Sequence, residues 1–282
     1  MGRSRPGDYR GKPLTEVTRR FPARGDAWAT MVVAPAMGVR QDFYAPLAHF
    51  LAASGIHVLT FDYRGMGFAR RGSLRGLDVD VMDWARELDA ALLEAQRMAP
   101  ALPLTVLGHS LGGQLLGVLE HNARIAAAVN VTAGSGFYRF NRRMRLQVRI
   151  FWFVAVPLLT PLFGYFPGKR LRMVGDLPAG VARQWRSWCL HPDYVVGRVP
   201  AARAAFERLR APLLAWSFDD DAIITREATQ SLHRFFRNAR IEHRHVAARE
   251  LGRRIGHFGY FAEASRADLW PGTLAWLRAQ VS

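Results

Sequence analysis

Cysteine is almost absent from the sequence: Cys189 is the only one in 282 residues, so the chain cannot form an internal disulfide. No group of His and Cys residues has the spacing of a zinc site, and we expect neither a bound metal nor a cofactor. The first twenty residues are basic and contain no apolar run of seven or more, which argues against a secretory signal. These absences favour a cytoplasmic protein that depends on an apolar core.

Lysine is also scarce, because only Lys12 and Lys169 contribute to the 39 basic residues and all the others are arginine. The formal net charge is +16. An excess of arginine over lysine is expected from a GC-rich genome, whereas a functional interpretation points to an anionic substrate, a membrane surface or nucleic acid. Nucleic acid is the least favoured partner, since no known binding motif accompanies the charge.

Apolar runs alternate with helical patterns along most of the chain, and half of the residues are apolar. We expect strands over residues 30–37, 57–63, 103–108, 125–132, 212–218 and 241–247, and helices over 44–54, 79–96, 226–236 and 259–280. Such alternation predicts an α/β fold with a mostly parallel sheet and helices on both faces. Ligands bind such sheets at the carboxyl ends of the strands.

A segment of different composition, 137–200, interrupts this alternation and separates a first core part, 1–136, from a second, 201–282. It holds eleven basic residues against two acidic ones and an uncharged run of 17 residues, 150–166. Because Pro157, Pro161 and Gly164 interrupt that run, we expect a buried or interfacial segment rather than a membrane span. The tryptophans of the segment either line an acyl-binding site or form its own core: Trp152, Trp185 and Trp188.

The stretch Gly108-His109-Ser110-Leu111-Gly112 lies between an expected strand and an expected helix. A tight strand-to-helix turn projects the serine side chain into a site, and the glycines let neighbouring backbone approach closely. A serine hydroxyl is a poor nucleophile at neutral pH, so it needs a base and a third group that orients the base. The motif therefore indicates a catalytic serine if an acid and a histidine follow in the chain.

The acid and the base each have several candidates downstream. Three carboxylates follow the strand at 212–218 directly: Asp219, Asp220 and Asp221. Four histidines lie beyond Ser110 in the second core part: His233, His243, His245 and His257. His257 is the one expected in a loop between the last strand and the last helix, whereas the other three lie in helix or strand patterns.

The order Ser110, Asp221, His257 is that of the α/β-hydrolases. The segments "APAMGVRQDFYAPLAHFLAASGIHVLTFDYRGMG", "GHSLGG", "WSFDDDAIIT" and "GHFGYF" resemble a bacterial group of predicted α/β-hydrolases described as serine aminopeptidase-like. The resemblance extends from about residue 28 to the end of the chain. It implies that Ser110 is the nucleophile, His257 the general base and Asp221 its orienting acid, with Asp220 as the alternative acid.

The resemblance also implies an oxyanion hole, formed by the backbone N–H groups of Met37 and Leu111. Pro35 and Ala36 stand where many of these hydrolases carry His-Gly, so the geometry of this loop is the feature in doubt. Segment 137–200 corresponds to a mainly helical cap over the site.

The sequence thus favours a serine hydrolase that cleaves an ester, thioester or related acyl bond of a small molecule through an acyl-enzyme on Ser110. The apolar cap indicates a hydrophobic acyl group, and peptide cleavage is less favoured because a fold-level name does not fix a substrate. A second hypothesis is a membrane-peripheral, lipid-binding protein with little or no catalysis. It rests on arginines that precede the apolar run, a pattern typical of attachment to anionic lipid at the inner membrane face: Arg139, Arg142, Arg143, Arg145 and Arg149.

Overall fold

A computed structural model of the chain describes residues 17–171 and 173–281. Residues 1–16, and with them most of the basic N-terminal stretch, lie outside the described part. The main sheet of this part contains seven strands: β1 (Thr18–Phe21), β2 (Ala29–Ala34), β3 (Ile56–Phe61), β4 (Leu104–His109), β5 (Ala127–Val131), β8 (Leu213–Phe218) and β9 (Ile241–Val246). Their order is β1-β3-β2-β4-β5-β8-β9, and only β1 runs antiparallel to its neighbour. The predicted mostly parallel sheet is confirmed.

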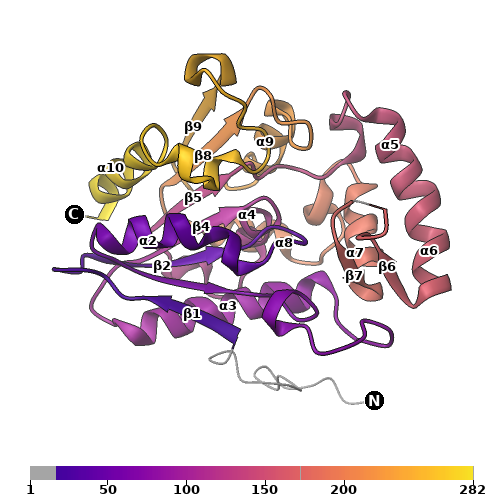
Figure 1. Cartoon of the computed structure of the whole chain (residues 1–282), viewed down its shortest axis with the longest axis horizontal. Helices are drawn as coiled ribbons and strands as arrows, with labels where there is room; N and C mark the ends of the chain where they lie inside the picture. The colour runs from indigo at the N-terminus through magenta and orange to yellow at the C-terminus, as the bar shows by residue number, and fades with distance from the viewer. Residues whose placement is uncertain (1–16, 172, 282) are drawn as a thin grey trace.

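Helices cover both faces of this sheet (Figure 1). The helices are α2 (Ala45–Ala53), α3 (Val81–Met98), α4 (Leu111–Leu115), α5 (Arg145–Ile150), α6 (Val156–Phe163), α7 (Ala179–Cys189), α8 (Ala202–Arg208), α9 (Arg226–His233) and α10 (Trp270–Val281). One apolar core joins α3 to the sheet and to the segment between β5 and β8, and a second joins α2 and α10 to the opposite face. All residues of β2, β4, β5 and β8 are buried, as expected of strands covered on both sides.

Two parts of the core differ from expectation. The strand β1 was not predicted, because it has four residues and exposes the arginines Arg19 and Arg20. The last helix begins at Trp270 rather than near residue 259, and short 3-10 turns precede it. Side chains hold those turns: Ser265 Oγ donates to the carbonyl of Gly259 at 2.7 Å, and Trp270 Nε1 donates to that of Tyr260 at 2.7 Å. These two backbone carbonyls therefore accept hydrogen bonds from side chains instead of from the backbone of an α-helix.

The segment between β5 and β8 is mainly helical, as predicted, and lies along one side of the molecule, at the right of Figure 1. It also contains a small antiparallel sheet of β6 (Tyr165–Pro167) and β7 (Asp176–Pro178). Trp152 and Trp188 are buried, and the rings of Trp152 and Trp185 meet edge to face at 4.8 Å. These contacts favour a role in the segment's own core. The division into 1–136, 137–200 and 201–282, with 137–200 as a cap, remains a proposal.

Most of the apolar run of this segment lies in one continuous helix, Arg145–Phe163. Only 22% of the most apolar 18 residues of this helix are buried. The expectation that Pro157 and Pro161 interrupt the run was wrong, whereas Gly164 does end the helix. The helix is buried on one side only. A π turn, Phe151–Ala155, directly precedes Pro157, and its wider hydrogen-bond spacing accommodates an amide that proline lacks. The helix ends at Gly164, which takes a left-handed conformation with φ of 73°.

His233 in α9 generates a prediction about stability. Its Nδ1–H donates to the carbonyl of Thr229 at 2.7 Å, and its Nε2 accepts from Asn130 in β5 at 3.0 Å. Burial, together with the charge of His243, lowers the pKa of His233 to about 4. Between pH 6.5 and 4 the unfolded chain therefore binds a proton that the folded chain does not. We expect this residue to contribute about 3 kcal/mol of stability at pH 7 that is lost as the pH falls to 4.

Urea unfolding of the wild type and of His233→Gln at pH 7 and pH 4 measures this contribution. When the pH falls from 7 to 4, the unfolding free energy of the wild type should decrease by about 3 kcal/mol more than that of the variant. An equal dependence on pH in both proteins would contradict the assignment.

Candidate active site

Ser110 occupies a sharp turn between β4 and α4. Its backbone has φ 50° and ψ −112°, a conformation that non-glycine residues rarely adopt. A Cβ added to Gly112 would lie 2.1 Å from the carbonyl oxygen of Ala34, and one added to Gly108 would lie 2.5 Å from Gly113 Cα. The turn is therefore packed against the end of β2 in a way that only glycine permits. The Ser110 N–H donates to the carbonyl of Val131 in β5 at 3.0 Å, which ties the turn to the other neighbouring strand.

The three aspartates after β8 have three different partners. Asp221 places Oδ2 2.8 Å from His257 Nδ1, and its Oδ1 accepts the backbone N–H groups of Ile223 and Ile224 at 2.7 and 3.0 Å. Asp220 instead accepts two backbone N–H groups of the loop before His257, residues 255 and 256. Asp219 accepts the N–H of Ala248 at 2.8 Å. The structure thus brings Asp221 to the histidine, and gives the alternative acid Asp220 a position that shapes the histidine loop.

His257 is 7% exposed and Asp221 is 3% exposed, so their pair is nearly removed from water. A carboxylate only accepts hydrogen bonds, so Nδ1 of the neutral imidazole carries the proton and Nε2 is free to accept one. This is the tautomer that a general base for a serine needs.

His109, the second residue of the motif, connects the histidine loop to the serine turn. Its ring is buried and lies 5.2 Å from the ring of His257. Nε2–H of His109 donates to the backbone carbonyl of His257 at 2.9 Å, since a carbonyl can only accept. Burial, with the charge of His257, lowers the pKa of His109 well below its ordinary value, so the ring is neutral and its Nδ1 is an acceptor.

Tyr44 supplies the proton that His109 Nδ1 accepts, at 2.8 Å. The same hydroxyl oxygen accepts the N–H of Ala36 at 2.9 Å. Burial raises the pKa of Tyr44, so the hydroxyl keeps its proton. A single chain of hydrogen bonds, which we call the relay, therefore runs from Ala36 through Tyr44 and His109 to the carbonyl of His257.

The loop after β2 holds the predicted oxyanion donor Met37, which is 9% exposed. The relay fixes Ala36 on one side of it. On the other side Gly38 has φ 76°, and a Cβ there would lie 2.0 Å from the carbonyl oxygen of Val174 in the inserted segment. Leu111, the other predicted donor, is the first residue of α4, where backbone N–H groups have no helical partner. Tyr44, from outside the motif, thus holds the loop at Ala36, where this chain departs from the His-Gly of many similar hydrolases.

The other downstream histidines lie elsewhere. His233 is bonded to Asn130 beneath the sheet, and His245 bonds Ser217 at 2.9 Å. His243 packs edge to face on His233 with ring centroids 5.4 Å apart. Of the four candidates only His257 has a hydrogen bond to a carboxylate after β8.

Comparison with known proteins agrees with this architecture. Residues 25–154, somewhat less than half of the chain, match the family model described as "Serine aminopeptidase, S33". A soluble variant of monoglyceride lipase from Saccharomyces cerevisiae superimposes with a TM-score of 0.66 and 14% identity, covering 94% of this chain and 91% of that one. The chain has the α/β-hydrolase fold.

Two further structures show the same likeness. A thermostable carboxyl esterase from Bacillus coagulans has a TM-score of 0.66 at 14% identity and covers 94% of both chains. MenH from S. aureus has a TM-score of 0.61 at 15% identity and covers 94% of this chain and 99% of that one. The resemblance stated from the sequence is confirmed at the level of the fold.

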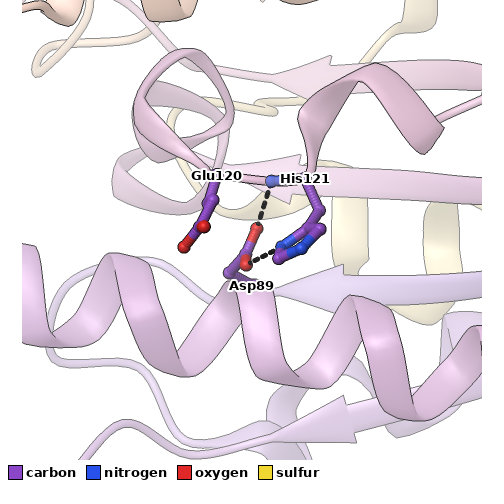
Figure 2. A group of neighbouring side chains, drawn as sticks. All are labelled: Asp89, Glu120 and His121. Carbon is purple, nitrogen blue, oxygen red and sulfur yellow. Dashed lines mark hydrogen bonds and ion pairs between the residues drawn. The ribbon is translucent and has the colours of Figure 1, made fainter. Parts of the chain in front are cut away.

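One group of side chains in the described part of the chain has the composition and distances of a metal site: Asp89, Glu120 and His121. Figure 2 shows Asp89 on α3 facing a turn that carries the other two. Asp89 accepts both the backbone N–H and the Nδ1–H of His121, at 2.9 and 2.5 Å, and Glu120 is exposed. The hydrogen bonds account for Asp89 and His121 as a link between this turn and α3, so we assign the group a structural role.

Sequence reasoning missed Tyr44. It lies within an expected helix pattern, and nothing in its own neighbourhood indicates a contact with His109, which is 65 residues away. The only feature of the sequence that could have pointed to Tyr44 is its place soon after the loop of Met37.

The relay in this α/β-hydrolase fold gives a prediction. In Tyr44→Phe, Ala36 loses its acceptor and His109 Nδ1 loses its donor, so both loops beside Ser110 become less constrained. We expect kcat on an activated ester to fall about 10- to 100-fold with a smaller change in KM, because a misplaced catalytic group affects the reaction more than binding. The matched control is Tyr260→Phe, whose buried hydroxyl bonds Thr273 in α10 at 2.7 Å. Equal kcat losses in both variants would show a general effect of removing a buried hydroxyl.

Proposed function

We propose that the protein is a serine hydrolase that cleaves an ester, thioester or related acyl bond through an acyl-enzyme on Ser110. The observation that supports this most strongly is the buried pair of His257 and Asp221, held by the relay beside the strained turn of Ser110. Because the Asp89–His121 pair has a structural role, the position of the His257–Asp221 pair next to the Ser110 turn is what supports catalysis.

In the first half of the reaction, His257 Nε2 takes the proton of Ser110 Oγ as the oxygen attacks the carbonyl carbon of the substrate. The carbonyl oxygen becomes an oxyanion, and the N–H groups of Met37 and Leu111 are proposed to stabilise it. The bond to the leaving group then breaks, and the leaving oxygen or sulfur takes the proton from His257. Asp221 stabilises the imidazolium that exists between these two transfers.

In the second half, His257 accepts a proton from water as the water oxygen attacks the acyl carbon. The bond to Ser110 Oγ breaks, the serine recovers its proton from His257, and the carboxylic acid leaves. No step needs a metal or a cofactor.

We propose a small substrate with a hydrophobic acyl group. Two aromatic side chains support this, since Phe43 is 36% and Phe258 is 45% exposed although both pack against the ring of His109. Partly exposed aromatic rings next to a nucleophile suit an apolar ligand better than a charged one. The names of the similar structures, a monoglyceride lipase and a carboxyl esterase, favour an ester over a peptide.

A second candidate function is peripheral membrane binding by a cytoplasmic protein at the inner membrane face. It is supported by the apolar, largely exposed helix Arg145–Phe163 and by the arginines at its start. The two functions are compatible, and each has its own test.

The proposed nucleophile is tested by labelling the folded wild type and Ser110→Ala with a fluorophosphonate probe, with mass spectrometry to locate the adduct. We expect an adduct on Ser110 in the wild type and none in the variant. Turnover of p-nitrophenyl esters of graded chain length should fall at least about 10 000-fold in Ser110→Ala. Equal thermal unfolding of the two proteins controls for folding, and turnover retained by the variant would refute the proposal.

The two candidate acids are distinguished by Asp221→Asn and Asp220→Asn. We expect Asp221→Asn to lower kcat about 10 000-fold, because it removes the charge that fixes the tautomer of His257. Asp220→Asn keeps one oxygen for the N–H groups of Ile255 and Gly256, so its loss should be at least 100-fold smaller. The reverse order of the two losses would assign the acid to Asp220.

A further inference from the structure

The helix Arg145–Phe163 has a continuous apolar face that no other part of the described structure covers. Its large side chains are 48% to 71% exposed: Leu146, Ile150, Phe153, Val154, Leu158 and Leu162. We call these six residues the outer face. Half of the twelve large apolar side chains that are exposed in the described residues lie on it. Spacings of three and four residues place them along one side of the helix.

The opposite side of the same helix is packed against the rest of the cap. Phe151, Trp152, Val156 and Thr160 are at most 6% exposed. Arg186 Nε donates to the carbonyl of Trp152 at 2.6 Å and thereby anchors the helix to α7. The helix therefore cannot cross a bilayer without losing its contacts with the rest of the segment. It lies lengthwise at the edge of the molecule (Figure 1), and its outer face is exposed.

The charges around the outer face are predominantly positive, and two acids near it are already paired, Asp176 with Arg70 and Glu227 with Arg142. No Asp or Glu occurs in the sequence between Glu120 and Asp176. Arg143, Arg145 and Arg149 are exposed at the start of the helix and pair with no carboxylate among the described residues. Lys169 and Arg170 are exposed just beyond its end. Two copies of this face would bring these cations together without acids to pair with, whereas anionic lipid headgroups complement them.

We infer that the outer face docks on an anionic bilayer, with the helix lying in the interface and its apolar side chains among the upper acyl chains. An amphipathic helix with Leu and Phe on one side and flanking arginines is the pattern of such interfacial attachment. Basic residues close to an anionic surface add to the affinity, and salt screens their contribution. The inference specifies the lipid partner of the second candidate function and does not depend on catalysis by Ser110.

Attachment at this face also bears on access to the site. Asn141, just before the helix, donates to the carbonyls of Ala222 and Ile223 at 3.1 and 3.4 Å, in the loop that follows Asp221. Arg142 lies 3.7 Å from Glu227 at the start of α9. A docked helix thus holds the candidate active site close to the membrane, where hydrophobic acyl substrates dissolve.

The test is co-sedimentation of the full chain with vesicles of phosphatidylcholine alone and of phosphatidylcholine with 30% phosphatidylglycerol, at low and high salt. We expect binding to the anionic vesicles that weakens as salt is raised, and at least tenfold weaker binding to the neutral ones. Leu158→Gln with Leu162→Gln should weaken binding at least about tenfold, because two apolar side chains that would enter the acyl-chain region are replaced by polar ones. Phe68→Gln, at a 54% exposed position outside this helix, is the matched apolar control.

The charge contribution has its own pair of variants. Replacing Arg143, Arg145 and Arg149 with Gln should weaken binding to anionic vesicles about 100-fold and reduce the salt dependence. Replacing three exposed arginines of the second core part changes the net charge equally and should have little effect: Arg210, Arg249 and Arg254.

Three outcomes would overturn the inference. They are absence of binding to anionic vesicles at low salt, equal weakening by the two arginine triples, and a wild-type dimer that Leu158→Gln with Leu162→Gln makes monomeric while vesicle binding is unchanged. The last would assign the face to a second copy of the chain, and light scattering detects it. Fluorophosphonate labelling in solution, measured on the same variants, shows whether a failure concerns the membrane or the serine.

Discussion

The close approach of the Ser110 turn to its two neighbouring strands is the constraint on which the candidate site depends. The serine has a positive φ, which costs free energy that the surroundings must offset. They do so through contacts that leave no room for a Cβ at Gly112 or Gly113, which face Ala34 of β2 and Ala133 after β5. The strands β2, β4 and β5 are parallel and adjacent. The loop of Met37, the Ser110 turn and a contact with the loop of His257 therefore lie together at their carboxyl ends.

Carboxylates hold the remaining loops by accepting backbone N–H groups. Asp219, Asp220 and Asp221 each bind a different part of the chain, and only Asp221 also binds a side chain that can transfer protons. Burying an ionised carboxylate is costly unless hydrogen bonds compensate, and two N–H groups and an imidazole do so at Asp221. Asp62 repeats this arrangement elsewhere in the fold, since it accepts the N–H groups of Gln41 and Phe68. The same interaction therefore serves both the fold and the site.

Local patterns predicted the sheet and the serine motif, because buried parallel strands are short apolar runs and the motif residues are close in sequence. The candidate acid and base lie far from Ser110 in the chain, and they were identified through the resemblance to α/β-hydrolases. Local patterns did not show which of the three aspartates is the candidate acid, because three identical side chains differ only in the contacts that tertiary structure gives them. Tyr44 was out of reach for the same reason. Pro157 was misread because a helix can absorb a proline next to a π turn, and the sequence does not indicate where such a turn will form.

Two of the contacts between the inserted segment and the core border the candidate site. The first part of the segment bonds the loop after Asp221 through Asn141, and its second part packs the backbone at Val174 against Gly38, beside Met37. A rigid-body movement of the segment would therefore pull on the loop after Asp221 and on the loop of Met37 together. Opening a path for substrate by lifting the whole segment would cost the geometry of both. We therefore expect a substrate to enter past the exposed side chains of Phe43 and Phe258, while the helix Arg145–Phe163 stays in place against the rest of the inserted segment.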